Sequence, residues 1–207
     1  SGFEWQPDAR IWWSPSDGHA LWGSIARAVR TPSRGDHDFR AILGALENSI
    51  VDSTVTLVRL VGNKDFTSES LLAFEAGYRA SLSPNVSVDV ATYVNQYDDH
   101  FVREPGLPFP ESDPLPTHLI LPLRIANGAT ATSIGLEAAV DWDVLDYWRL
   151  RTAYSYIDLE VKLPPGSLDT TTESYEGDSP HHQFAVRSFT NLAPDWEIYA
   201  GGRYVGA

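Results

Sequence analysis

The stretch that decides the fold is SLLAFEAGYRASLSPNVSVDVATYVNQYDDH, which runs from Ser70 to His100. On both sides of the Ser-Pro-Asn at residues 83–85, apolar and polar residues alternate with a period of two. Successive side chains of a strand point to opposite faces of a sheet, so this stretch predicts two antiparallel strands joined by a tight turn. The apolar parity of the first strand contains Leu72, Phe74, Ala76, Tyr78, Ala80 and Leu82.

The same alternation recurs along most of the chain, for example in SIGLEAAVDW (133–142) and WRLRTAYSYID (148–158). Repeated segments of about ten alternating residues are typical of transmembrane barrel strands. Eight principal strands are predicted: Ala9–Trp13, Ala20–Arg30, Ser70–Leu82, Val86–Phe101, Thr117–Val144, Trp148–Val161, His182–Thr190 and Trp196–Val205.

The connections between these strands alternate in length. Four are tight polar or Pro-containing turns, at residues 14–19, 83–85, 143–147 and 192–195. Three are long and are predicted to be outer loops, at about 31–69, 102–116 and 162–181. Short turns at one end and long loops at the other are characteristic of outer-membrane barrels. The fold class predicted for residues 1–207 is therefore all-β: a partial domain forming an antiparallel up-and-down transmembrane β-barrel segment of about eight strands.

Two local features are less regular. The apolar spacing of FRAILGALENSI (Phe39–Ile50) fits a short amphipathic helix, and a hairpin in the loop is the alternative. The strand at Thr117–Val144 is too long to be uniform, so a bend or break is expected around Ala126–Gly128, where glycine can supply a bulge.

Composition excludes several classes of protein. The 28 acidic and 15 basic residues give a net charge of -13, which is opposite to what binding nucleic acid requires. The chain has no cysteine for a disulfide or thiolate metal site, and no apolar run long enough for a transmembrane helix. Its seven Trp and nine Tyr fit surfaces that are apolar at one end and wet at the other. A membrane would therefore be crossed with strands.

Several segments resemble successive barrel strands of TonB-dependent outer-membrane receptors, in that family's order. They are LWGSIARAVRTPSR (21–34), the stretch from Asn63 to Asp99, IANGATATSIGLEAAVDW (125–142), YWRLRTAYSYID (147–158) and SPHHQFAVRSFTNLAPDWEIYAGGRYVGA (179–207). The resemblance implies a bacterial outer-membrane location, contact with lipid, and a parent receptor of about 22 strands with a plug and TonB as partners. It also implies uptake of a scarce solute such as a ferric siderophore or another metal chelate.

The sequence departs from that family pattern in what it contains. No plug, TonB-contacting box or terminal aromatic strand is recognisable, so the chain is expected to be a fragment that does not transport by itself. Its outer strands would expose unpaired backbone groups, and such edges favour self-association or closure into a smaller barrel.

The polar parity of the strands holds the candidate functional residues. Charges there would be costly in hydrocarbon, so a water-filled lumen that guides solute and plug is the functional interpretation. An ordinary solvated sheet face with cross-strand ion pairs is the alternative. The lumen-facing candidates are Glu75, Arg79, Asp89, Asn95, Glu137, Asp141, Arg149 and Arg151.

Metal and catalytic sites are not predicted. His181 and His182 are adjacent on a predicted strand and would point to opposite faces, and Asp98–His100 forms no spaced ligand set. Acidic pairs such as Asp36 and Asp38 lie in polar loops without a nucleophile to orient. Neither an enzyme activity nor a cofactor is expected. The alternatives to a receptor are a soluble β-sandwich that binds carbohydrate through its aromatic residues, and a secreted β-rich hydrolase.

Overall fold

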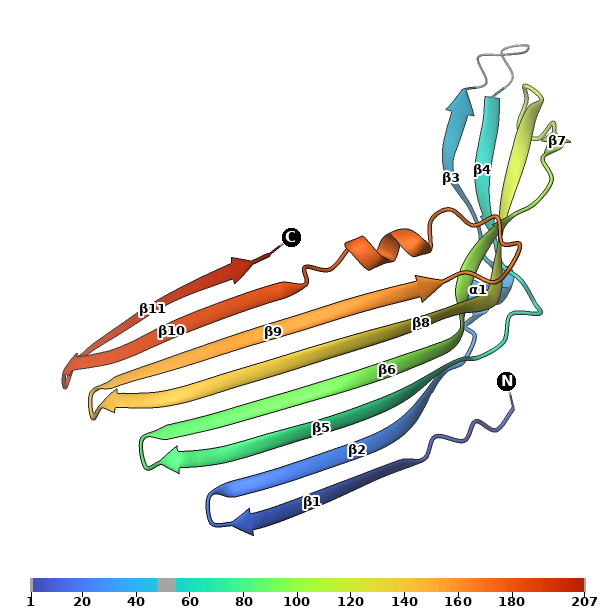
Figure 1. The fold of residues 1–207 in the computed structure, drawn as a ribbon. Coiled ribbons are helices and arrows are strands. Elements are labelled where there is room, and N and C mark those ends of the chain that lie inside the picture. The colour runs from blue at the N-terminus through green and yellow to red at the C-terminus, as the bar shows by residue number, and fades with distance from the viewer. Residues whose placement is uncertain (1, 48–54, 207) are drawn as a thin grey trace.

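A computed structural model describes residues 2–47 and 55–206 of the chain. One antiparallel sheet dominates it, and Figure 1 shows its long strands lying side by side in the order β1-β2-β5-β6-β8-β9-β10-β11. These strands are β1 (Asp8–Ser16), β2 (His19–Arg30), β5 (Glu69–Ser83), β6 (Val86–Pro105), β8 (His118–Leu145), β9 (Trp148–Lys162), β10 (His182–Ala193) and β11 (Trp196–Val205). All eight predicted strands are confirmed.

The sheet is open, because within the described residues β1 pairs only with β2 and β11 only with β10. Each sequential pair of long strands is antiparallel, as in an up-and-down barrel wall. A β-sandwich would instead pack two sheets face to face. The sandwich alternative therefore finds no support in this architecture.

The two ends of the sheet differ. The tight turns between β1 and β2, β5 and β6, β8 and β9, and β10 and β11 all lie at the left-hand end in Figure 1. We call this the short-turn end. The long connections leave from the opposite end, here called the long-loop end.

At the long-loop end, three further strands build an extension of the sheet. β3 (Arg40–Glu47) pairs with β4 (Val55–Val61), β4 runs parallel to the first part of β8, and β7 (Phe109–Glu111) pairs with β8 from the other side. In Figure 1 the extension turns away from the direction of the long strands. We use the name extension for β3, β4, β7 and the part of β8 before Asn127.

The helix considered for Phe39–Ile50 is wrong, because Arg40–Glu47 is strand β3; residues 48–50 lie outside the described part. A short apolar run fits a buried strand as well as a helix. β4 supplies partners along Arg40–Glu47, with a register shift at Leu43, whereas an isolated helix of this length is marginal in water. Of this connection only α1 (Arg34–Asp38) is helical among the residues described.

The predicted bend near Gly128 is confirmed. Gly128 has φ +147°, and opposite it Asp99 has φ 56°, with register shifts in the β6–β8 pairing at this level. Asn127 fixes the bend: its amide nitrogen donates to the carbonyl oxygens of Asp99 at 2.8 Å and Thr67 at 3.1 Å. A side chain other than glycine at position 128 would be strained in this conformation.

The buried core is small and lies at the long-loop end. Val102, Ala129, Ala131 and Val161 form it, covered in part by Leu163 from the connection that follows β9. Every residue of β1 and β11 is exposed, and the sheet also leaves large apolar side chains such as Phe74, Ile134 and Phe184 exposed. No helix among the described residues is long and apolar enough to cross a membrane.

Candidate functional site: the polar face and the junction cluster

Strand register sorts the side chains onto two faces. Residues that are directly opposite on neighbouring strands share a face. One such row crosses the sheet through Arg79, Asp89, Ala139, Ala153, Ala185 and Arg203. With the period of two along each strand, this row places all eight predicted lumen-facing residues on one side, here called the polar face. That this face lines a lumen stays a prediction.

Ion pairs cross the polar face near the short-turn end. Arg79 Nε donates to Asp89 Oδ2 at 2.6 Å, and Arg151 pairs with Asp141 on the neighbouring strand. Arg149 pairs with Asp143, which the sequence interpretation did not name. These side chains are well exposed, so solvent screens each pair and its contribution to stability is small.

The other predicted residues have neutral hydrogen-bond partners, and Glu75 also lies 3.9 Å from Arg10 Nη2. Glu75 accepts a hydrogen bond from Ser24 Oγ at 3.0 Å, and Asn95 donates to Ser133 Oγ at 3.2 Å. Glu137 borders a hollow of 330 Å³ that has an alanine floor and Arg203 on its far side. This part of the polar face can receive a polar partner close to the backbone, because its floor residues are Ala91, Ala139, Ala153 and Ala185.

Two large rings on the polar face lie over glycines. The Trp22 ring covers Gly77, and the Tyr93 ring covers Gly135, so closely that a Cβ at either glycine would lie under 3.0 Å from ring atoms. Each glycine stands directly opposite its aromatic partner on the neighbouring strand. The aromatic ring supplies the packing that the glycine lacks, which pins the strand register.

The opposite face is apolar. It carries Phe74, Val94, Ile134, Leu136 and Phe184, which share the parity opposite to that of the polar face. Tyr78, bonded to His19 at 2.7 Å, and Tyr154, bonded to His182 at 2.8 Å, lie on this face in one row through Val90 and Ala138. An apolar band of this kind is the outer surface of a membrane barrel.

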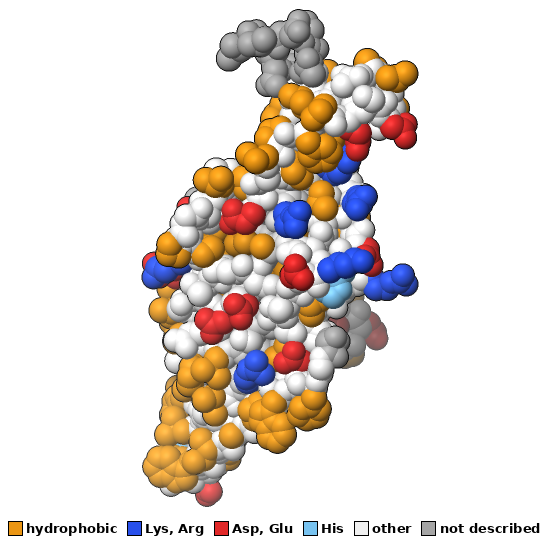
Figure 2. Space-filling view, turned by 90° about the vertical axis from the view of Figure 1, so that its right-hand side faces the viewer, with side chains coloured by type: hydrophobic (Ala, Val, Ile, Leu, Met, Phe, Trp, Pro, Cys, Tyr) orange, Lys and Arg blue, Asp and Glu red, His pale blue; other side chains and the backbone are white. Residues whose placement is uncertain are grey.

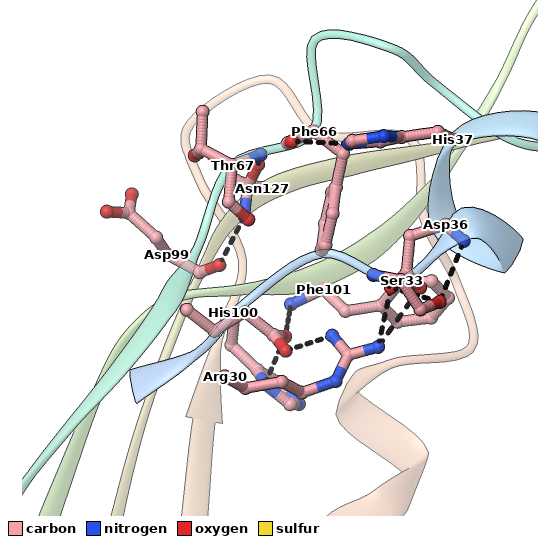
Figure 3. Close-up of polar contacts among 11 residues, drawn as sticks. Arg30, Ser33, Asp36, His37, Phe66, Thr67, Asp99, His100, Phe101 and Asn127 are labelled. Atoms are coloured by element: carbon pink, nitrogen blue, oxygen red, sulfur yellow. Dashed lines mark hydrogen bonds and ion pairs between the residues drawn. The ribbon is translucent and has the colours of Figure 1, made fainter. Parts of the chain in front are cut away.

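A second group of polar residues joins the sheet to the extension, and we call it the junction cluster: Arg30, Asp36, Phe66, Glu69, His100, Phe101 and Arg103. Arg30 lies between the carboxylates of Asp36 and Glu69, and Figure 3 shows the Arg30 guanidinium group directed at Asp36. The side chains of these two acids are only 11% and 9% exposed. Glu69 Oε1 also accepts from Phe101 N at 2.7 Å and lies 3.0 Å from His100 Nδ1. The cluster ties three strands together where β2 leaves the sheet.

Rings and guanidinium groups alternate through the junction cluster. Arg30 lies 5.9 Å from the Phe66 ring, Phe66 meets Phe101 edge to face at 6.4 Å, and Arg103 lies 5.2 Å from Phe101. On its other side, the Arg103 guanidinium carbon lies 5.9 Å from the ring centroid of Tyr175, in the short 3-10 helix η1 (Glu173–Gly177).

Figure 2 looks onto the long-loop end, where acidic and basic side chains gather in the middle of the view.

The carboxylates of the junction cluster are stabilised in their charged form. Burial alone would raise the pKa of Glu69, but hydrogen bonds from His100, Arg30 and the Phe101 N–H overcome this and lower it. The pKa of Asp36 is likewise lowered, because its capping contacts with Ser33 and the Arg30 pair outweigh the effect of burial. The carboxylates of Glu69 and Asp36 therefore stay ionised at neutral pH.

Asp169 anchors the connection between β9 and β10 onto β6. Its carboxylate accepts from Arg103 N at 2.7 Å, from Thr171 N at 2.7 Å, and from the hydroxyls of Thr171 and Thr172. Burial would raise the pKa of Asp169, but these bonds lower it to about 2. The connection is therefore held over the buried core at the long-loop end rather than extending freely.

The histidines considered as metal ligands are separated by their contacts. His181 Nδ1 lies 2.9 Å from Ile157 O, whereas His182 Nδ1 faces Tyr154 Oη. His100 turns to Glu69, and no cluster of three His, Cys, Asp or Glu that could hold a metal occurs within residues 2–47 and 55–206. The structure does not bring these histidines together.

Sequence reasoning missed the junction cluster and Asp169. Two local signals were present: Ser33 and Asp36 have the spacing of a capping box, which α1 indeed forms, and Asp169 precedes three threonines that can close a local turn. Nothing in the sequence indicates that Arg30 meets Glu69, because the two lie 39 positions apart.

Comparison with known proteins decides the family. The description "TonB dependent receptor-like, beta-barrel" matches residues 1–207, the whole chain. The chain belongs to the TonB-dependent receptor β-barrel family. No curated protein matches it. Barrels of this family are outer-membrane proteins of Gram-negative bacteria, and its members are receptors or transporters rather than enzymes.

Solved structures with the same fold include proteins described as siderophore receptors and an iron transporter. The siderophore receptor PirA from Acinetobacter baumannii superposes with a TM-score of 0.71 at 18% identity, over 98% of this chain and 29% of PirA. A ferric enterobactin receptor (PfeA) mutant from Pseudomonas aeruginosa gives 0.70 at 16% identity, over 98% and 28%. The FrpB iron transporter from Neisseria meningitidis gives 0.64 at 11%, over 97% and 26%.

The TonB-dependent receptor chain described here thus spans less than a third of the length of these structures. Its resemblance to them is a resemblance of fold. It extends to almost every described strand, which supports a barrel wall and leaves the carbohydrate-binding sandwich without support. Family members bind solutes such as siderophores, and their full proteins work with a plug domain and TonB.

Proposed function

We propose that this chain forms a section of barrel wall in an outer-membrane receptor that takes up a scarce nutrient such as a ferric siderophore. The observation that carries the proposal is the separation of the two sheet faces, one apolar and the other charged. A single sheet with an uncovered apolar face is unstable in water, and lipid covers such a face in a barrel.

In this proposal the polar face lines a water-filled lumen and contacts a plug domain. Glu137 and Arg203 border the open hollow and have no ion-pair partner among the described residues, so they are available to a plug or a passing solute. TonB would act through the plug, and the chain alone would not carry out energised uptake. Its open edges at β1 and β11 would pair with other strands of the receptor.

The extension and the connection anchored by Asp169 would then face the cell exterior. Their backbones are held by the junction cluster and by the Asp169 hydrogen bonds, so they can present a defined surface to a solute. The solute class is inferred from PirA, PfeA and FrpB, which are described as a siderophore receptor, a ferric enterobactin receptor and an iron transporter.

The test is to replace residues 40–61, which contain β3 and β4, with a short Gly-Ser linker in the full-length receptor. Uptake of ferric siderophores from a panel should fall at least about tenfold, because the capture surface is lost while the barrel strands remain. Surface display, measured with an antibody, should be unchanged. The matched control shortens the turn at residues 14–18 and should retain uptake. Undiminished uptake of every siderophore that the wild type transports would contradict the proposal.

A further inference from the structure

Glu111, His118 and Arg59 form a charged triad inside the extension, and the contact between Glu111 and His118 changes when the imidazole gains a proton. Glu111 at the end of β7 and His118 at the start of β8 are directly opposite each other. Arg59 from β4 grips the Glu111 carboxylate with both terminal nitrogens, one of them at 3.0 Å from Oε1. His118 Nε2 lies 3.5 Å from Glu111 Oε2, and the imidazole side chain is only 9% exposed.

The contacts of His118 show which nitrogen carries hydrogen. Nδ1 lies 3.0 Å from the carbonyl oxygen of Pro116, and a carbonyl oxygen can only accept. Nδ1 is therefore the protonated nitrogen. In the neutral ring Nε2 then directs a lone pair at a carboxylate oxygen, and this buried atom has no hydrogen-bond partner among the described residues. Adding one proton turns this repulsive contact into an N–H directed at Glu111.

The two charged neighbours of His118 have opposite effects on its protonation. Glu111 attracts a proton to His118, and Arg59, which shares the same carboxylate, opposes it. Glu111 is the only ion-pair partner of His118 in the described part of the chain. Because the Arg59 hydrogen bond lowers the pKa of the Glu111 carboxyl, that group remains ionised near neutral pH. A change of charge in the triad between about pH 5 and 8 therefore belongs to the histidine.

We propose that His118 is a proton-binding site that clamps β7 onto β8 when it is protonated and loosens this pairing when it is neutral. β7 is only three residues long, so the clamp is a large part of what holds it. Since β4 is joined to the same carboxylate through Arg59, the proton draws together the three strands that meet at Glu111. The extension would thus change its order with the pH outside the cell.

Hydrogen exchange on the full-length receptor tests this inference without reference to transport. Exchange of backbone amides in residues 107–121 is measured at pH 5.5 and 7.5 with a metal chelator present, and each rate is divided by the intrinsic rate at that pH. The wild type should be about three- to tenfold better protected at pH 5.5. His118→Gln and Glu111→Gln should both lose this difference. His182→Gln, the same change on a histidine that faces Tyr154, should keep it.

A second readout covers the case in which His118→Gln disorders the extension. Exchange of the ring C2 hydrogen of His118, followed from pH 5 to 8, reports its protonation directly in the wild type. The ring should titrate within this range, and Glu111→Gln should move its titration to lower pH. The proposal is overturned if His118 does not titrate there, if Glu111→Gln leaves its titration in place, or if protection of residues 107–121 is equal at both pH values in the wild type.

Discussion

Filling the space under the Tyr93 ring gives the most direct test of how the sheet is held in register. Gly135→Ala places a methyl group where the ring lies, at less than 3.0 Å from its atoms, so the ring must move. Overpacking of this kind costs about 1–3 kcal/mol. Alanine also restricts the unfolded chain more than glycine does, which returns about 0.4–1 kcal/mol. The net expectation is destabilisation of about 1–2 kcal/mol.

Without the Tyr93 ring, Gly135→Ala should stabilise the protein instead of destabilising it. In a Tyr93→Ser background the space above Gly135 is empty, so Gly135→Ala should stabilise by about 0.4–1 kcal/mol. The difference between the two backgrounds is the coupling energy of a double-mutant cycle, expected at about 1–3 kcal/mol. Gly202→Ala is the control, because a methyl group there meets only Val186 Cγ1, at 4.0 Å.

The assay is guanidinium unfolding of the full-length receptor in detergent micelles, followed by tryptophan fluorescence and by the gel mobility of unheated samples. All five proteins, including the wild type and Tyr93→Ser, are compared at constant detergent concentration. A coupling energy indistinguishable from zero, or equal effects of Gly135→Ala and Gly202→Ala, would refute the claim that the aromatic ring and the glycine form one packing unit.

Two further predictions concern the sheet faces and the anchored connection. Leu136→Arg, on the apolar face midway along β8, should cost about 2–4 kcal/mol and reduce membrane insertion, whereas Glu137→Arg on the adjacent polar face should insert normally; equal insertion defects would contradict the assignment of faces. The pKa of Asp169 is about 2, against 3.8 for a free side chain. Its ionised carboxylate therefore stabilises the folded state by about 2 kcal/mol above pH 3.8, and this stabilisation is lost as the pH falls towards 2. Pepsin cleavage within residues 163–181 should therefore rise steeply between pH 4 and pH 2, and Asp169→Asn should show rapid cleavage already at pH 4.

Residues that alternate with a period of two defined most of the sheet. In β5 and β6 the side-chain parity alone separates Phe74 and Val88 from Glu75 and Asp89, because the pleat of a strand leaves no other arrangement. Pro or Asn marked three of the four hairpin reversals, at residues 14–19, 83–85 and 192–195. The order and the length asymmetry of the connections then indicated an up-and-down barrel wall, and the family comparison agrees with this.

The alternation of apolar and polar residues did not predict structure that depends on contacts between residues far apart in the sequence. Arg40–Glu47 reads equally well as a helix, and only its pairing with β4, which itself runs parallel to β8, makes it a strand. Gly128 signalled a bend, but its fixation by Asn127 depends on Thr67, 60 positions away. Parallel pairing of this kind has no local sequence signature.

The sequence by itself determined the strands, their two faces and the eight charged or polar residues of the polar face, because these follow from local periodicity. Only the tertiary structure decided that Arg30 lies between Asp36 and Glu69, that Tyr93 covers Gly135, and that His118 faces Glu111. These contacts depend on the register between strands and on the path of long connections. Turns and the apolar pattern set the register within a hairpin, but contacts such as that of Tyr93 with Gly135 join residues across long connections, so no single segment of the chain contains both partners.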